Sequence, residues 1–520
     1  MNLKKQIKII KKLISNPFYI ALVFLIVLNI GLHLYVLRNN NFYFTVDQAK
    51  PAVYAREFFE NKRLLFKGPE TSVQGIYAGP LWNYFISIGY FIFSAHPFGA
   101  VFMQIVVQTI LLAILGIVIS KQVSKWQSLV IIFSLIFYWR FFETALWDFN
   151  PFPLITLKII ITLILIQFLQ TKNQKYYVLA AIPIFLGYNT EVAGAAASSF
   201  FYFIFGVWAV FVKRLNIKNF FIGTIIFPLT GGLFLLKSLI NRYQISGTFY
   251  SGNVSHGLGT FTSTNFSQMA EEFSHIISVA VLPGYYPLGI IIFAGLIILF
   301  LKFNKNQNKF IKYFLYLTLL RLITSFVFYG SNHGWRDWHT LHFYPVILIC
   351  YLLLVFSLKT KLKYILIITT LIFHLNYFNQ RFATYPFPKD DPTILSNEMK
   401  VLDWIYTHNE NNGFNAYTYT STFFDYHYQY LFWWYGKGKY GFVPCEYTIY
   451  PKAPKETYIP HYLDYSKPTL GCDRLVFLII ESDTNAQTNT NWINDFKKQT
   501  KLLESTNVGK TVIEKREYLR

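Results

Sequence analysis

Two acidic side chains of this 520-residue sequence stand where a carboxylate could do chemistry at a membrane surface. Asp47 follows a long apolar run, in Phe-Thr-Val-Asp-Gln-Ala, and Asp148 precedes another, in Trp-Asp-Phe-Asn-Pro. A carboxylate there can accept a proton from a hydroxyl or an amine, or help to hold a divalent cation against a phosphate donor. The alternatives are a solvated loop acid or a helix cap for Asp47, and an interfacial Trp before a Pro-started helix for Asp148.

Further polar residues cluster at the ends of apolar runs. Glu191 stands between two runs, where an ionisable group is costly unless it faces a cavity or a partner. The segment Gly-Trp-Arg-Asp-Trp-His at 334–339 offers a basic group to a leaving phosphate, with an interfacial aromatic belt as the alternative. The candidates for substrate binding are Gln48, Tyr77, Glu143, Asn150, Glu191, Arg336, Asp337, His339 and His342, and those for phosphate binding are Arg336, Arg63 and Lys67.

The histidines do not form a recognisable metal motif. The regions around His256, His275 and 333–342 lack a tight ligand spacing such as His-x-x-x-His with a carboxylate, so we predict no zinc site. No cofactor is certain, and a loosely held Mg or Mn ion stays open. Neither a Walker loop nor a dinucleotide fingerprint is present in the sequence.

The elements that position these residues are hydrophobic segments. The chain is 53% hydrophobic and 14% charged, with a mean hydropathy of +0.34, which few soluble domains reach. Runs such as residues 18–36 approach or reach the ~20 residues that a bilayer core demands of a helix. The net charge of +21 comes mostly from short basic clusters between apolar runs, so we read it as a topology signal and predict no nucleic-acid partner.

The basic clusters also give an orientation. Alternate loops are basic and nearly free of acid, and the positive-inside rule places them in the cytoplasm together with the N-terminus. The alternation holds only if residues 81–95 lie at the outer interface or re-enter the membrane without crossing it. We therefore predict a polytopic helical membrane protein with about eleven spans, near residues 18–37, 98–120, 127–142, 152–170, 176–190, 193–212, 219–239, 286–302, 311–329, 341–357 and 362–378.

The chain changes character near Arg381, where it becomes polar and punctuated by prolines. Helical spacing at 398–408, 426–435 and 492–502 and strand patterns at 414–420 and 475–480 predict a small α/β domain. The domains are then 1–378, with a first outer loop at 38–97, and a soluble extracytoplasmic domain at 379–520. Cys445 and Cys472 both fall in the second domain, either as a disulfide or as two free buried thiols.

This layout resembles the GT-C superfamily of membrane glycosyltransferases, especially the protein O-mannosyltransferases and the lipid A aminoarabinose transferase. Asp47, the run Gly79-Pro80-Leu81-Trp82 and Asp148 occupy the places of the family's first acid, its Pro-Leu-aromatic motif and its second acid. The resemblance covers about residues 1–240, while residues 241–378 follow it only as a series of spans. In one departure, Ala78 stands where the family has Lys or His, so a phosphate ligand must come from elsewhere.

The resemblance implies a glycosyltransferase of the cell envelope, in the inner or cytoplasmic membrane, with Asp47 activating the acceptor. Its partners would be a polyprenyl-phosphate-linked sugar, membrane lipid, and a glycan, lipid or protein acceptor. The short cytoplasmic loops favour that donor over a nucleotide sugar. Two alternatives are an O-antigen polymerase or ligase, which the short late outer loop disfavours, and a lipid or solute transporter, for which no inverted repeat is visible.

Overall fold

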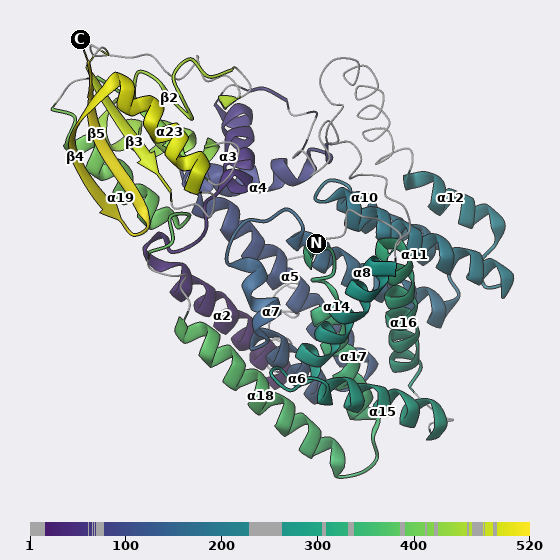
Figure 1. The fold of residues 1–520 in the computed structure, drawn as a ribbon. Coiled ribbons are helices and arrows are strands. Elements are labelled where there is room, and N and C mark those ends of the chain that lie inside the picture. The colour runs from purple at the N-terminus through teal and green to yellow at the C-terminus, as the bar shows by residue number, and fades with distance from the viewer. Residues whose placement is uncertain are drawn as a thin grey trace, which may run out of the picture.

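The computed structural model describes two packed parts, a helical domain and a C-terminal domain built on a mixed sheet (Figure 1). The sheet lies at one end of the helices, beside α3 and α4 (Figure 1). The described residues are 16–60, 62–64, 66, 68, 77–227, 263–303, 308–330, 337–384, 390–410, 413–420, 425–454, 457–459, 472, 474–481 and 486–519.

The protein is a multi-pass membrane protein, because several of its helices are long and apolar. Five described helices can cross a membrane by length and composition, or six if α6 and the segment after it, bent by 73°, form one span. The count of eleven spans therefore stays a prediction, and residues 228–239 of the seventh span lie outside the described residues. The helices that fall on the predicted spans are α2 (Pro17–Leu37), α5 (Phe98–Gln122), α6 (Lys125–Ile136) with α7 (Trp139–Phe142), α8 (Phe152–Thr171), α9 (Gln174–Leu179) with α10 (Ala181–Gly187), α11 (Val192–Phe211), α12 (Ile217–Phe227), α15 (Leu288–Phe303), α16 (Lys309–Gly330), α17 (Phe343–Ser357) and α18 (Leu362–Thr384).

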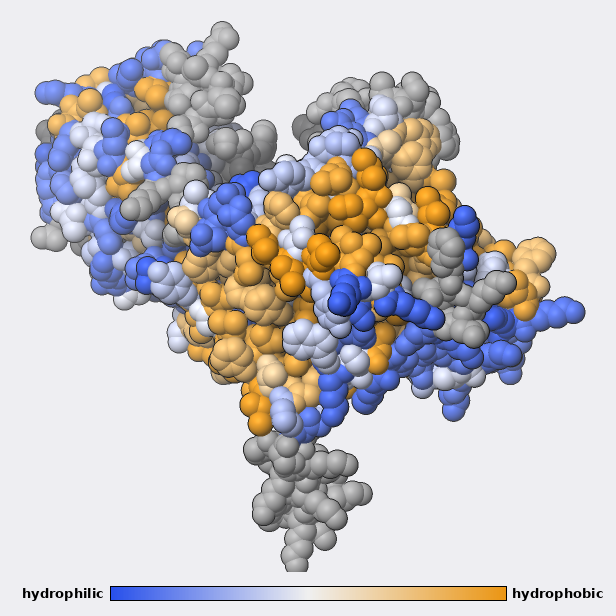
Figure 2. Space-filling view, turned by 90° about the horizontal axis from the view of Figure 1, so that it is seen from below, coloured by the Kyte–Doolittle hydropathy of each residue, from blue (hydrophilic) through white to orange (hydrophobic). Residues whose placement is uncertain are grey.

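The surface of the helical domain suits a lipid environment. Figure 2 shows a broad hydrophobic area over the helices, while the C-terminal domain at the upper left is largely hydrophilic. Large apolar side chains are exposed along α2, α15 and α18, among them Phe24, Ile291 and Ile368. Water would penalise such exposure, whereas lipid tails would not.

The segment at residues 81–95 forms α4 (Leu81–Ile92), which packs between α3 (Val46–Phe59) and α5. Its 12 residues extend roughly 18 Å, well short of the ~30 Å hydrocarbon core. A helix of this length agrees with the expected element that does not cross the membrane. Its inner face is fixed by Trp82, Ile86 and Tyr90, which are buried.

One described helix was not predicted. Between the predicted spans at 219–239 and 286–302 only a loop was expected, but α14 (Ser263–Val281) lies there and packs against α15, α16 and α17. Its apolar stripe, which includes Met269, Phe273 and Ile276, lies in the core of the helical domain. Mean hydropathy missed this helix because acidic and polar residues occupy its other face, and only the helical spacing reveals the stripe.

The C-terminal domain is the expected α/β unit. Its five-stranded sheet has the order β2-β1-β3-β5-β4, in which β1 runs parallel to β2 and β3 while β5 is antiparallel to β3 and β4. The strands are β1 (Phe414–Tyr419), β2 (Tyr447–Thr448), β3 (Leu475–Ile480), β4 (Thr500–Val508) and β5 (Thr511–Tyr518), and the helices are α19 (Leu395–Thr407), α20 (Tyr426–Leu431), η6 (Phe432–Gly436), α21 (Lys437–Tyr440) and α23 (Ala486–Gln499).

Two details of this domain differ from, or go beyond, the sequence prediction. The helix expected at 492–502 ends at Gln499, and β4 begins at Thr500, so its last three residues were wrong. Tertiary pairing with β5 overrides the local helical spacing there. Cys445 and Cys472 form a disulfide, with Cα atoms 5.9 Å apart, which decides between the two alternatives.

The C-terminal domain is held against the loop at residues 38–97 by backbone and side-chain contacts. The amide of Phe44 donates to the carbonyl of Thr393 at 2.9 Å, and the amide of Leu395 donates to the carbonyl of Phe42 at 3.0 Å. The hydroxyl of Tyr430 in α20 donates to a carbonyl after α4 at 2.6 Å. One apolar cluster spans α3, α4, the start of α5 and the sheet, so α3 is packed from both sides.

The loop at residues 38–97 is also fixed against the turn between α10 and α11. The amide of Gly79 donates to the carbonyl of Tyr188 at 2.9 Å, and the side chain of Asn189 accepts from the amide of Leu81 at 3.3 Å. A Cβ at Gly79 would lie 2.0 Å from Oδ1 of Asn189. Only glycine therefore permits this close approach.

We predict that Gly79→Ala destabilises the folded chain by about 1–3 kcal/mol, because backbone and Asn189 must move apart. Thermal unfolding of the detergent-solubilised chain measures this. Gly31→Ala in α2 is the matched control, since a Cβ there meets nothing within 4 Å. The penalty should shrink in an Asn189→Ala background, and an equal penalty in both backgrounds would show that the contact is not its cause.

Candidate active site

The helix α3 begins with a capping box that places Asp47 and Gln48. The side chain of Thr45 accepts from the amide of Asp47, and the side chain of Gln48 returns to the amide of Thr45 at 2.8 Å. The pattern Thr-x-x-Gln explains why the helix starts here. Asp47 points outward and is exposed, while the buried amide of Gln48 donates to the backbone carbonyl of Asp148.

Asp148 is the buried member of an acidic pair. It is 2% exposed, and its Oδ1 accepts from the amide of Gln104 in α5 at 3.0 Å. Burial raises the pKa of Asp148 to about 6; the Gln104 hydrogen bond opposes the shift, the Asp47 charge adds to it, and Trp82 opposes it. The two acids are therefore close enough to interact, although they come from segments about 100 residues apart.

Glu191 forms the N-cap of α11. Its two carboxylate oxygens accept from the amides of Ala193 and Gly194, and Oε1 lies 3.7 Å from Nε2 of His339. The ring of His339 stacks on Tyr329 at 5.2 Å between centroids. Burial raises the pKa of the Glu191 carboxyl, while the Gly194 amide and the charge of Lys158 act in the opposite direction.

Two buried cations complete this group. Nζ of Lys158 in α8 lies 3.2 Å from Nδ1 of His342, and Nη1 of Arg321 in α16 donates to the carbonyl of Lys158 at 2.7 Å. A Cβ at Gly194 would lie 2.6 Å from Glu191 Oε2 and 3.3 Å from Lys158 Nζ, so ammonium and carboxylate face the same small space. Buried charges of this kind inside a membrane domain mark functional sites.

The acidic pair and the cationic group border one region, which we call the mouth: the start of α3, residues 143–151, the α10–α11 turn and residues 337–342. The ring of Phe149 beside Asp148 contacts Trp338 beside His339, with centroids 5.9 Å apart. The loop at residues 38–97 closes the other side through its contacts with Asn189. Asp47, Asp148, Glu191, His339 and His342 therefore gather at one end of the helical domain.

Other candidates lie nearby with partners of their own. Glu143 pairs with Arg140 at 3.0 Å, and Arg63, on the exposed surface, pairs with Glu57 at 2.9 Å. Tyr77 is half-buried, as is Asn150, whose Oδ1 is buried without a hydrogen bond in the described part of the chain. Arg336 and Lys67 lie outside the described residues, as does the side chain of Asp337, which begins the short helix η5 (Asp337–His339). Their assignment to substrate or phosphate stays a prediction.

Lys158 and Arg321 were not predicted as site residues. Basic residues in loops indicate topology, whereas these two are single cations inside apolar runs. The signal was present in Leu-Ile-Thr-Leu-Lys-Ile-Ile-Ile and Leu-Leu-Arg-Leu-Ile, because an isolated cation within a span requires a buried partner. Arg140, in Trp-Arg-Phe-Phe, is a third example.

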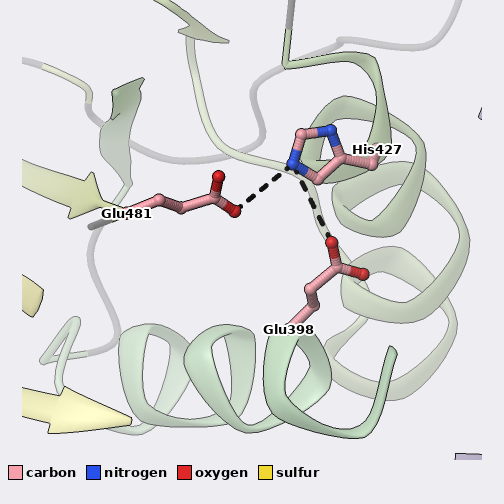
Figure 3. Close-up of side chains that lie close together, drawn as sticks. All are labelled: Glu398, His427 and Glu481. Carbon is pink, nitrogen blue, oxygen red and sulfur yellow. Dashed lines mark ion pairs between the residues drawn. The ribbon is translucent and has the colours of Figure 1, made fainter. Parts of the chain in front are cut away.

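A second group of chemically capable residues lies in the C-terminal domain. Glu398, His427 and Glu481 are buried, and one ligand atom of each lies within 4.8 Å of the others (Figure 3). No sequence pattern indicates this group, because its members are far apart in the chain and lack a spacing motif. These three residues could hold a metal ion.

No protein-family model and no curated protein matches the sequence. Among solved structures, ArnT from Cupriavidus metallidurans bound to undecaprenyl phosphate matches with a TM-score of 0.58 and 9% identity, over 95% of this chain and 97% of that chain. Its apo state gives a TM-score of 0.57 with the same identity and coverage. The apo oligosaccharyltransferase of Archaeoglobus fulgidus follows with a TM-score of 0.49 and 11% identity, over 80% of this chain and 64% of that chain. The likeness to ArnT confirms the expected GT-C-like fold.

The buried carboxyl of Asp148 predicts a pH-dependent stability. Its pKa is near 3.8 ordinarily and about 6 in the folded chain, so the folded state binds the proton more tightly. The contribution of this carboxyl to the free energy of unfolding is fully present below pH 4, and it falls by roughly 3 kcal/mol as the pH rises to 6. Asp148→Asn should remove that decline. The melting temperature of the variant, relative to that of the wild type, should therefore rise between pH 4 and 6 and stay at a constant difference above pH 6.

The matched control for this comparison is Asp495→Asn, which removes an exposed acid of the C-terminal domain. It should show a constant offset from the wild type across the same range. A constant offset for Asp148→Asn as well would contradict the raised pKa.

Proposed function

We propose that this chain is a glycosyltransferase that moves a sugar from a polyprenyl-phosphate donor to an acceptor at the outer face of a membrane. The observation that carries the proposal is the mouth: two acids and a buried cationic group meet there, at the end of a fold shared with ArnT. An ArnT structure contains undecaprenyl phosphate, which supports a donor of the same class for this chain. The donor lipid would enter the mouth laterally from the bilayer.

The acceptor would be activated by Asp47. This carboxylate is exposed at the start of α3, where an incoming hydroxyl or amine can reach it, and the buried amide of Gln48 fixes the helix start to the Asp148 segment. Asp47 accepts the proton from the hydroxyl or amine of the acceptor, while the acceptor's oxygen or nitrogen forms a bond to the sugar C1. The bond between C1 and the phosphate oxygen breaks, and its electron pair leaves with the lipid phosphate, inverting C1.

The leaving phosphate needs positively charged hydrogen-bond donors that are not all bound to another anion. Lys158 and Arg321 form a cationic group beside the single acid Glu191, with the imidazole of His342 next to Lys158, and their charge suits a phosphate at the mouth. Arg336 remains our first sequence-based candidate for this role, and it lies outside the described residues. The basic side chains together would take the role of the Lys or His that the family has at the position of Ala78.

The finer assignment concerns sugar, acceptor and side of the membrane. We propose hexosyl or pentosyl transfer to a glycan, lipid or protein, with Glu143, Asn150 and Tyr77 among the sugar or acceptor contacts. The disulfide between Cys445 and Cys472 supports an oxidising compartment for the C-terminal domain, outside the cytoplasm. The N-terminus would then lie in the cytoplasm, and the protein in the inner or cytoplasmic membrane.

Asp47→Asn tests the proposal in proteoliposomes supplied with a panel of radiolabelled undecaprenyl-phosphate sugars and membrane-extract acceptors. We expect the variant to lose roughly 100-fold or more of the wild-type transfer, because a general base contributes about that much. The asparagine is nearly isosteric, so binding of undecaprenyl phosphate itself, followed by native mass spectrometry, should persist.

Glu60→Gln, near the other end of the same helix region, is the matched control and should retain transfer. Full transfer by Asp47→Asn would contradict the assignment of Asp47 as the general base. A wild-type protein that moves the lipid or a solute across the membrane and transfers no sugar from any donor in the panel would instead identify a transporter.

A further inference from the structure

The C-terminal domain contains a polar centre that the proposed function does not use. Glu398 comes from α19, His427 from α20, and Glu481 directly follows β3, so three separate elements supply the side chains. All three are at most 3% exposed. Figure 3 shows both carboxylates directed at the same imidazole nitrogen.

The distances in this centre are too long for hydrogen bonds and suitable for a shared ion. Nε2 of His427 lies 3.8 Å from Oε1 of Glu398 and 3.6 Å from Oε1 of Glu481. Both oxygens of Glu398, Oε1 of Glu481 and both ring nitrogens of His427 are buried without a hydrogen-bond partner. Around a tetrahedral ion with bonds of ~2.0 Å, ligand atoms stand roughly 3.3 Å apart, so small side-chain rotations would bring all three into contact with it.

The charge balance of the centre also favours a cation. Two buried carboxylates facing one imidazole cost several kcal/mol each unless they are neutralised, by protons or by a positive ion. Among the residues that the structure describes, neither glutamate forms an ion pair with a lysine or an arginine, and the other charged groups that act on Glu398 are the carboxylates of Glu481 and Asp391. A divalent cation would neutralise both carboxylates at once.

We propose that Glu398, His427 and Glu481 bind one divalent transition-metal ion of the zinc class. One imidazole nitrogen with two carboxylate oxygens is a donor set that zinc and its first-row neighbours accept, whereas magnesium and calcium prefer oxygen ligands alone. The ion ties α19 and α20 to the end of β3. This site is separate from the mouth, and the proposal does not depend on the transferase function.

The ion has a structural role because α20 is also the helix that supports the first outer loop. Tyr430 of α20 donates to the carbonyl of Ala95 and packs its ring against Phe44, with centroids 5.6 Å apart. The same helix packs on α3, whose first turn carries Asp47. Removing the ion should therefore loosen the C-terminal domain and its contact with α3.

Metal analysis of the full chain, purified in detergent through an affinity tag without histidines, tests the site. Elemental mass spectrometry should find about one Mn, Fe, Co, Ni, Cu or Zn ion per chain, and removal by a chelator should lower the melting temperature until Zn²⁺ is restored. His427→Gln and Glu481→Gln should each lower the metal content at least tenfold.

His408→Gln is the matched control, because His408 also faces a glutamate, at 3.7 Å from Glu504, but at the surface of the same domain. It should keep the full metal content. If the triad variants fold poorly, the stripped wild type decides: Co²⁺ added to it should give visible absorption bands of a low-coordinate site. A wild type that holds less than a tenth of an ion per chain, both as purified and after Zn²⁺ loading and desalting, overturns the proposal, as does metal content unchanged in correctly folded triad variants.

Discussion

The structure depends most on the pairing of charges that have been buried inside the helical domain. A lone charge in that setting costs several kcal/mol, and water is not available to screen it. Several partners stabilise the carboxylate of Glu191. The first amides of α11 donate to its oxygens, and Lys158 and His339 lie close to it. Because these partners come from α8, α11 and the segment before α17, the charge network fixes where those helices end relative to one another.

Around that network the remaining elements form a mouth with two chemically different sides. Its acidic side is Asp47 with Asp148, held together by Gln48 and Gln104, and its cationic side is Lys158 with Arg321, next to the imidazole of His342. An acid can take a proton and a cation can hold a phosphate, so the two sides suit the two halves of a group transfer. The C-terminal domain contributes by packing on α3, which fixes the helix that carries the proposed base.

The sequence predicted the fold well where local patterns decide it. Hydropathy located a helix at every predicted span for which residues are described, and Pro-Leu-Trp after Gly79 marked the start of the short helix α4. Mean hydropathy missed α14, because its polar face masks an apolar stripe. The β4–β5 hairpin was also missed, since its strands are stabilised by pairing with each other and with β3, which no local pattern reports.

The candidate site was predictable only in part, for a related reason. Asp47, Asp148 and Glu191 stand at the ends of apolar runs, where position alone indicates a role, whereas Lys158 and Arg321 become meaningful once their partners on other helices are known. The centre at Glu398, His427 and Glu481 brings together three elements of a folded domain, and no spacing in the chain announces it.

The most direct test of the account is a cryo-electron microscopy structure of the full chain in lipid nanodiscs with undecaprenyl phosphate. We expect the phosphate at the mouth, within about 4 Å of at least one of Lys158, Arg321, Arg336, His339 and His342, with Asp47 facing the same space. A phosphate bound at the opposite end of the helices, or no bound lipid phosphate at saturating concentration, would contradict it.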